Sequence, residues 1–133
     1  MWTELLMIVL DSDVMIDLLR QYRPAIAWLD SLGEEEIILP GFVVMELLQG
    51  CRNRAEQIKV EQILTGFETV WPLPETCEAA LIIFADSHLS HGIGLLDALI
   101  GQTAVALNLP LCTFNRKHYA AIPNLITVSP YNK

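Results

Sequence analysis

Short apolar runs separated by stretches with helical spacing are the feature that most constrains the fold of this chain. The first run, Leu6 to Leu10, is continuously apolar and stops at Asp11, as expected of a strand buried on both faces. A later segment, Glu68 to Leu73, is a short strand candidate that is cut by two prolines. The other predicted strands are Glu36–Leu39, Leu111–Phe114 and Leu125–Val128. Strands of this kind belong in a sheet that is covered by helices.

Helices are predicted between these strands from capping signals and apolar spacing. Asp13 can cap the first helix, because its carboxylate can accept an orphan N–H of the first turn. Thr76 can cap a later helix in the same way, and Pro24 suits the first turn of another. The predicted helices are Val14–Gln21, Pro24–Leu32, Phe42–Gly50, Arg54–Phe67, Thr76–Leu89 and Leu95–Leu107. The alternation predicts an α/β sandwich with a short, mostly parallel central sheet.

Length and composition narrow the class of protein. The 133 residues fit one domain, spanning 1–133, and the hydrophobic fraction of 53% excludes a disordered chain. No apolar run reaches the roughly 18 residues that span a membrane, and the start lacks the basic region of a secretory signal. The three cysteines have no metal-type spacing, which favours thiols in a reducing compartment. We therefore expect a cytoplasmic protein without a membrane partner.

The formal charge of −8 bears on the choice of partner. It argues against loose, charge-driven binding to nucleic acid, whose affinity comes from neutralising phosphates. It still allows an enzyme that contacts phosphates through metal ions and a few local cations. An acidic body would also attract a basic partner.

Three carboxylates stand in apolar surroundings far apart in the chain, namely Asp11, Glu46 and Asp97. Acids are seldom fully buried unless they are paired or bind a cation. Asp11 and Asn115 both come just after a predicted strand, at the sheet edge where such folds bind ligands. The pattern predicts one shared cavity that holds a divalent metal.

Four segments resemble, in order and spacing, the motifs of the PIN domain, as found in the VapC ribonuclease toxins. These segments are Leu10–Asp17, Val44–Gly50, Asp97–Ala104 and Leu109–Asn115. The tail from Ile122 to Tyr131 is similar to the family's ending, so the resemblance covers nearly the whole chain. It implies a Mg²⁺- or Mn²⁺-dependent ribonuclease that leaves a 5′-phosphate and a 3′-hydroxyl.

The resemblance also implies roles for individual residues. Asp11 and Asp97 would be the principal metal ligands, and Glu46 would complete the pocket as a ligand or through a metal-bound water. Asn115 lies where many members carry a further acid. It removes one negative charge, which disfavours a firmly held second metal.

The chemistry of these residue types agrees with the roles that the resemblance implies. Mg²⁺ prefers oxygen ligands and usually takes one or two carboxylates together with water and substrate phosphate. Glu46 could orient or deprotonate the attacking water. Ser12 and Thr113 could hydrogen-bond a carboxylate, a metal water or a phosphate. Arg116 and Lys117, directly after Asn115, are candidates for RNA-phosphate contacts.

Plainer interpretations stay open for each position. Asp11 could simply end a strand, and Glu46 could be a surface position on a helix. Asp97 sits near a helix start, where the helix dipole favours a carboxylate even without metal. Asn115 is a common turn residue, and Arg116 with Lys117 could form an ordinary exposed turn.

Three functions are weighed. The first is an endoribonuclease that acts as the toxin of a VapBC-type toxin–antitoxin pair, with RNA as substrate, a small antitoxin as partner and a homodimeric assembly. The second is a non-catalytic binding module on the same fold. The third is a phosphohydrolase of the haloacid dehalogenase type, suggested by Asp11-Ser12-Asp13 after a strand, although neither Lys59 nor Lys117 has a convincing context for it.

Overall fold

The structure is a computed structural model that describes residues 7–32 and 36–133. The described strands form a five-stranded sheet in the order β3-β2-β1-β4-β5, and every neighbouring pair is parallel. The strands are β1 (Met7–Leu10), β2 (Glu36–Pro40), β3 (Glu68–Val70), β4 (Leu111–Cys112) and β5 (Thr127–Val128). The predicted α/β class with a parallel central sheet is confirmed. Leu6, predicted to start the first strand, lies outside the described residues.

All six predicted helices are present, Leu95–Leu107 with the predicted bounds and the other five with shifted ends, and a short seventh follows the fourth strand. The helices are α1 (Ser12–Leu19), α2 (Arg23–Ser31), α3 (Gly41–Gln49), α4 (Arg54–Leu64), α5 (Pro74–His91), α6 (Leu95–Leu107) and α7 (Arg116–Tyr119). Within the described ranges, none of them combines the length and the apolar character that a membrane crossing requires.

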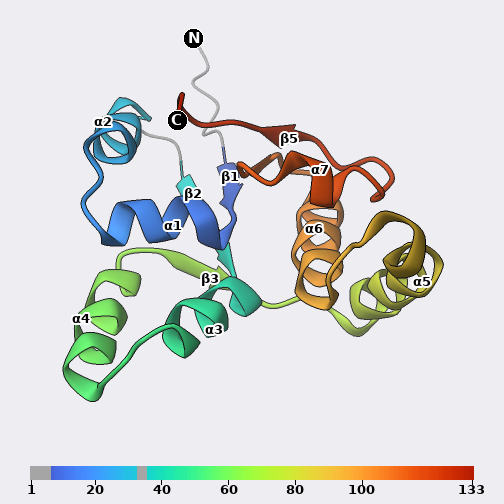
Figure 1. Ribbon diagram of the computed structural model, residues 1–133, viewed down its shortest axis with the longest axis horizontal. Helices are drawn as coiled ribbons and strands as arrows, with labels where there is room; N and C mark the ends of the chain where they lie inside the picture. Colours follow the sequence, from blue (N-terminus) through green and yellow to red (C-terminus); the bar gives the residue numbers. More distant parts are fainter. Residues whose placement is uncertain (1–6, 33–35) are drawn as a thin grey trace, which may run out of the picture.

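The strand order determines how the helices divide over the two faces of the sheet. The chain moves in one direction from β1 to β2 to β3, then jumps back past β1 to β4 and β5. Because parallel crossovers are right-handed, α1 to α4 should cover one face and α5 to α7 the other. Figure 1 shows α1, α2 and α4 at one end of the molecule and α5 at the opposite end, with α3 and α6 between them.

The prediction that Asp13 caps the first helix is wrong. Asp11 is the capping residue, with extended backbone angles of φ −79° and ψ 165°, and its Oδ1 accepts the N–H of Ser12 at 2.8 Å. The helix therefore begins two residues earlier than predicted. Thr76 is not a cap either, because α5 begins at Pro74, a residue whose missing N–H costs nothing at a first helical position.

Further boundaries differ from the prediction, and the last strand is Thr127–Val128 instead of Leu125–Val128. The third strand ends at Val70, before the prolines that remove backbone donors, and the fourth is only two residues long. The helix predicted to reach Phe67 ends at Leu64. The helix Arg116–Tyr119 was not predicted, because four polar and aromatic residues show no apolar periodicity.

The core fastens the helices that carry acids onto the central strands. Leu10 of β1 and Leu39 of β2 are fully buried, as are Val14 and Met15 of α1 and Val43 of α3. Burying a side chain of this size stabilises a fold by roughly 1.5–3 kcal/mol. This packing determines where the end of β1 and the middle of α3 lie relative to one another.

The start of α3 depends on a close approach between Gly41 and the ring of Trp71. A Cβ at Gly41 would lie 2.3–2.4 Å from three ring atoms of Trp71. We expect Gly41→Ala to push the half-exposed ring away and to lower the free energy of unfolding by about 1–3 kcal/mol. Urea unfolding followed by tryptophan fluorescence would measure both the loss and the displaced ring.

Gly50, at the other end of the same helix, supplies the control. A Cβ there would meet only backbone oxygens at 3.6 and 3.7 Å, which is ordinary contact. Gly50→Ala should leave stability and fluorescence nearly unchanged. Equal effects of the two substitutions would show that the contact with Trp71 does not matter.

Candidate functional site

Four carboxylates gather where the strand order of the sheet reverses. Asp11 follows β1, Asp13 lies in the first turn of α1, Glu46 lies in α3, and Asp97 lies in the first turn of α6. The strand order reverses between β1 and β4, and open α/β folds bind ligands beyond the carboxyl ends of the strands at such a point. The fold thus brings together the three acids that the sequence singled out and adds Asp13.

Asp11 is the most buried of the four, with 4% of its surface exposed. Its Oδ1 accepts the N–H of Ser12, and its Oδ2 accepts the hydroxyls of Thr113 at 2.9 Å and Tyr119 at 2.8 Å. Burial raises the pKa of the Asp11 carboxyl, and the nearby Asp13 raises it further, while these hydrogen bonds oppose the rise. Asp11 is therefore held rigidly and at some electrostatic cost.

Asp13 joins α1 to the segment that follows β4. Its Oδ2 accepts the N–H of Phe114 at 2.8 Å and the hydroxyl of Thr113 at 3.4 Å, while its Oδ1 accepts the N–H of Val14. Burial raises the pKa of the Asp13 carboxyl above its ordinary value. Most of its oxygen lone pairs are used by the protein, so its main contribution to the site is negative charge and loop placement.

The pKa of Glu46 is affected by all three other acids. Burial raises the pKa of its carboxyl from 4.5 to about 7, with further contributions from the charges of Asp11, Asp97 and Asp13 in that order. Like charges disfavour the ionised form only when they lie close together. The shift is therefore the clearest electrostatic sign that α1, α3 and α6 present their acids to one common space.

Asp97 takes the position expected at a helix start. Its Oδ2 accepts the N–H of Gly94 at 3.1 Å, which satisfies one orphan donor of α6. The Nδ1 of His118 on α7 lies 4.0 Å from the same oxygen. Asp97 therefore stabilises the start of α6 and also belongs to the acidic cluster.

The supporting residues differ in how they take part. Thr113 is fully buried and donates to Asp11, and its Oγ1 accepts the N–H of Asn115 at 3.0 Å. Ser12 takes part through its backbone N–H. Asn115 is exposed directly before α7, and within the described chain its side chain makes no hydrogen bond. Its amide therefore faces solvent at the rim of the cluster.

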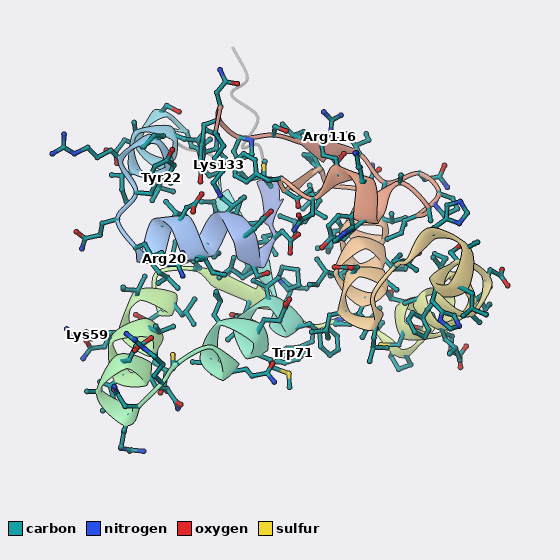
Figure 2. The ribbon with its side chains drawn as sticks, in the orientation of Figure 1. Arg20, Tyr22, Lys59, Trp71, Arg116 and Lys133 are labelled. Carbon is teal, nitrogen blue, oxygen red and sulfur yellow. The ribbon has the colours of Figure 1, made fainter. Side chains whose placement is uncertain are left out.

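Arg116 and Lys117 are exposed on α7. The Nε of Arg116 donates to Thr127 Oγ1 of β5 at 3.2 Å, and Figure 2 shows this arginine beside α7 and β5. Both basic residues line a hollow of about 430 Å³ between α7 and the β5 strand. Two exposed cations thus lie on the same short helix as Tyr119, whose hydroxyl donates to Asp11.

Tyr119 is the site residue that the sequence analysis missed. It is 1% exposed, and its hydroxyl donates to Asp11 from the last turn of α7. Burial and the charge of Asp11 raise the pKa of the Tyr119 hydroxyl, so it stays protonated and acts as a donor. No local pattern marks this tyrosine, because its partner is 108 residues away in the sequence.

The donor set fits a hard divalent cation. Carboxylate oxygens dominate the cluster, and Mg²⁺ and Mn²⁺ prefer oxygen ligands, with water and phosphate completing the shell. In residues 7–32 and 36–133, no three His, Cys, Asp or Glu side chains stand close enough to enclose an ion by themselves. Such a site relies on a few protein ligands plus water, as is usual for Mg²⁺.

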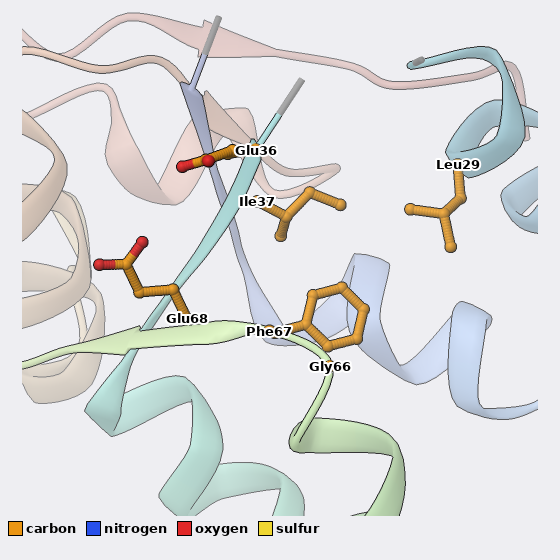
Figure 3. A pocket seen from close by; sticks show the side chains of 6 residues that line it. All are labelled: Leu29, Glu36, Ile37, Gly66, Phe67 and Glu68. Atoms are coloured by element: carbon orange, nitrogen blue, oxygen red, sulfur yellow. The ribbon is translucent and has the colours of Figure 1, made fainter. Parts of the chain in front are cut away.

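A separate cavity of about 500 Å³ opens at the opposite edge of the sheet. Figure 3 shows Leu29, Ile37 and Phe67 pointing toward a common space, with Glu36 and Glu68 at its border. Glu36 and Glu68 are the first residues of β2 and β3. This edge is the amino end of the strands, away from the position where parallel folds place their active sites.

The comparison with known families agrees with this geometry. The sequence model of the PIN domain matches residues 8–123. The chain belongs to the PIN domain family. PIN domains are generally nucleases, which is the kind of activity that an acidic cluster at strand ends supports. A search among curated proteins finds no match in sequence.

Solved structures share the PIN fold at low sequence identity. A toxin–antitoxin complex from Klebsiella pneumoniae matches with TM-score 0.76 and 24% identity, over 95% of this chain and 99% of that one. VapBC2 from Rickettsia felis, bound to a promoter DNA fragment, matches with TM-score 0.78 and 23% identity, over 92% of this chain and 98% of that one. FitAcB from Neisseria gonorrhoeae matches with TM-score 0.74 and 24% identity, over 92% of this chain and 97% of that one. These likenesses establish the fold.

The shifted pKa of Glu46 predicts a pH-dependent stability without added metal. The folded state keeps this proton to a pH of about 7 while the unfolded state loses it near 4.5, so stability should fall as pH rises between these values. Glu46→Gln removes that loss. At about pH 8 in EDTA we expect the variant to gain on the order of 1 kcal/mol, after solvent screening, and to gain little at about pH 5.

Thermal unfolding at both pH values measures this difference. The exposed Glu78 on α5 provides the matched control, because Glu78→Gln removes the same charge far from the cluster. A pH-independent effect of Glu46→Gln, or an equal effect of Glu78→Gln, would contradict the electrostatic coupling at the site.

Proposed function

We propose that this protein is a metal-dependent endoribonuclease and the toxin of a toxin–antitoxin pair. The observation that carries the proposal is the gathering of Asp11, Glu46 and Asp97 from three helix starts and helix faces at one strand edge, where burial and then the charges of Asp11 and Asp97 raise the pKa of Glu46 to about 7. Like charges held together at a strand edge make sense when the ligand is a cation. Membership in the PIN family supports nuclease chemistry at this position.

Asp11 and Asp97 would hold Mg²⁺ or Mn²⁺, and Glu46 would complete the pocket directly or through water. When bound, the metal polarises the scissile phosphate and lowers the pKa of a bound water. Thr113 holds the Asp11 carboxylate from one side, and Gly94 holds that of Asp97. These fixed contacts keep the ligands oriented before substrate arrives.

Glu46 is the best candidate for general base. A general base works best when its pKa lies near the operating pH, and the carboxyl of Glu46 has a pKa of about 7 in the acidic cluster. A cation beside it would lower this pKa and favour the ionised form. Glu46 would then take a proton from the attacking water while the leaving oxygen departs from the phosphate.

The cations of α7 would hold the RNA next to the cut. Arg116 and Lys117 are exposed within one helical turn of Asn115. Local cations are needed because the formal charge of −8 gives no general attraction for phosphates. Arg116 is already steadied by Thr127, which lowers the entropy lost when it binds a phosphate.

A small antitoxin is proposed as the partner, and neighbours of this fold include toxin–antitoxin complexes. A groove of about 670 Å³ runs between α1, α2 and α4, lined by residues such as Leu19, Ile26 and Ile63. Met15 and Leu18 are buried in the core and form the floor of this groove. An amphipathic antitoxin helix fits such an apolar groove.

A second groove of about 480 Å³ leads from this region to the acidic cluster. It is lined by Leu19 and Ile63, which also line the first groove, and by Glu46. A basic antitoxin segment laid along both grooves would reach the acids and compete with the metal. The acidic charge of the chain favours such a partner.

The homodimer stays a prediction. Large apolar side chains are exposed on α5 and just before it, including Trp71, Leu73 and Leu81. Grouped exposed apolar side chains often mark protein contacts. Most residues of the apolar segment from Phe42 to Leu48 are less exposed than this surface.

The competing functions are separated by simple results. The family match leaves no support for a haloacid dehalogenase-type phosphohydrolase. A non-catalytic binding module on the PIN fold would show neither RNA cleavage nor heat stabilisation by Mg²⁺ or Mn²⁺. The proposed enzyme should show both.

The first test of function is the loss of activity in ligand variants. Purified protein should cleave single-stranded RNA with Mg²⁺ or Mn²⁺ and stop in EDTA. Asp11→Asn and Asp97→Asn should each lower kcat/KM by about 100-fold or more, because a catalytic metal supplies several kcal/mol. Gel analysis of labelled RNA measures the rates.

Asp86→Asn is the matched control, since Asp86 is exposed on α5 away from the cluster. It should cleave like wild type. A contaminating ribonuclease would be present in all three variants alike, so loss of cleavage in the two ligand variants alone assigns the activity to this protein. Unchanged cleavage by both Asp11→Asn and Asp97→Asn would refute the assignment.

A second test addresses the RNA contact. Replacing Arg116 and Lys117 together by alanine should raise KM by roughly 10-fold and flatten the salt dependence of KM, since two phosphate contacts are lost. The value of kcat should change little. Arg54→Ala on α4, at the far end of the molecule (Figure 1), should leave both constants unchanged. Equal KM values in the double variant and Arg54→Ala would exclude this role.

A further inference from the structure

Two consecutive residues of α7 reach two different acids of the cluster. The Nδ1 of His118 lies 4.0 Å from Asp97 Oδ2, and the hydroxyl of Tyr119 donates to Asp11 Oδ2 at 2.8 Å. His118 is exposed, whereas Tyr119 is 1% exposed. The tyrosine contact is therefore the one that solvent cannot replace.

The buried hydroxyl of Tyr119 has no packing purpose that phenylalanine would not serve. A buried hydroxyl without a partner costs about 1–3 kcal/mol. Here that hydroxyl donates to the carboxylate of Asp11. The oxygen atom thus acts on one specific carboxylate, and that carboxylate is a candidate metal ligand.

The hydrogen bonds of Asp11 determine which of its lone pairs can face a ligand. A carboxylate offers about four acceptor positions, two on each oxygen. Tyr119 and Thr113 occupy both positions of Oδ2, and the N–H of Ser12 occupies one position of Oδ1. Among the described residues, no donor takes the remaining position on Oδ1.

The backbone around Tyr119 is built for this contact. A Cβ at Gly101 of α6 would lie 3.2 Å from Tyr119 Cδ1 and 2.3 Å from Ile122 Cδ1. Glycine therefore lets α7 approach α6 closely. Because α6 also carries Asp97, the same approach sets Tyr119 and Asp97 relative to each other.

We propose that Tyr119 is a positioning residue that turns Oδ1 of Asp11 toward the divalent metal by holding Oδ2 in the protein. This inference rests on the proposed metal-dependent function. Partners that orient a ligand typically contribute 10–100-fold to metal affinity. Without the phenol, the carboxylate can rotate about its Cβ–Cγ bond, and the ligand oxygen is no longer pre-oriented.

Mn²⁺ titration by isothermal calorimetry tests the proposal without relying on catalysis. Tyr119→Phe keeps the ring and removes only the hydroxyl, and its Kd for Mn²⁺ should rise about 10-fold. The matched control is Tyr131→Phe, because the Tyr131 hydroxyl donates to Asp17 at 2.6 Å rather than to a proposed metal ligand. The control should lose comparable stability but keep the wild-type Kd.

RNA cleavage gives a second readout that a simple loss of stability would not move. At limiting Mn²⁺, Tyr119→Phe should be slow, and excess Mn²⁺ should return kcat to near the wild-type value. KM for RNA should stay constant, because Tyr119 is buried and cannot contact the substrate. If Tyr119→Phe fails to fold, Thr113→Val removes the other hydroxyl from the same oxygen and should also weaken Mn²⁺ binding.

The outcomes separate this inference from the function on which it rests. Weaker Mn²⁺ binding by Tyr119→Phe, with wild-type binding by Tyr131→Phe, supports it. Equal or tighter binding by Tyr119→Phe, or by Thr113→Val in its place, overturns it and leaves the metal-dependent function intact. Absence of Mn²⁺ binding by the wild-type protein overturns both.

Discussion

Electrostatic repulsion among the acids where the strand order of the sheet reverses is the constraint on which this structure depends. Burial raises the pKa of both Asp11 and Glu46, Asp13 raises both further, and Asp11 and Asp97 add to the rise at Glu46. The fold tolerates them because hydroxyl and N–H donors face the two most buried carboxylates. A buried charge that is fully hydrogen-bonded costs far less than an unpaired one. The cluster of carboxylates therefore attracts cations.

Topology explains why these acids meet at all. The jump from β3 back past β1 to β4 leaves the ends of β1 and β4 side by side, and the chain after each strand is free to carry polar groups. Helices on opposite faces then add one acid each, Glu46 from α3 and Asp97 from α6. Glu46 comes from within a helix, whereas Asp97 comes from a first helical turn, where its carboxylate also accepts the N–H of Gly94. Four carboxylates separated by up to 86 residues thus share one space.

Sequence predicted well what local patterns encode and poorly what depends on long-range contacts. Asp11 and Asp97 were found because an acid in an apolar run is unusual, and the strands and long helices followed from periodicity. Asp13 was assigned as a cap because a cap is a local role, whereas its carboxylate accepts the N–H of Phe114, which follows the neighbouring strand β4 and is 101 residues away in the sequence. Tyr119 gave no signal, since only the folded chain brings it to Asp11.

The same contacts change how Asn115 should be understood. Its neutral amide suggested that the site lacks a charge, but its side chain is exposed at the rim. Asp13 lies deeper, and its charge raises the pKa of both Asp11 and Glu46. The fourth negative charge of the cluster therefore comes from α1. Because the oxygens of Asp13 already accept hydrogen bonds from Thr113, Phe114 and Val14, that charge attracts a cation without offering it a ready ligand. Strong attraction with few available ligand oxygens favours one firmly held metal over two.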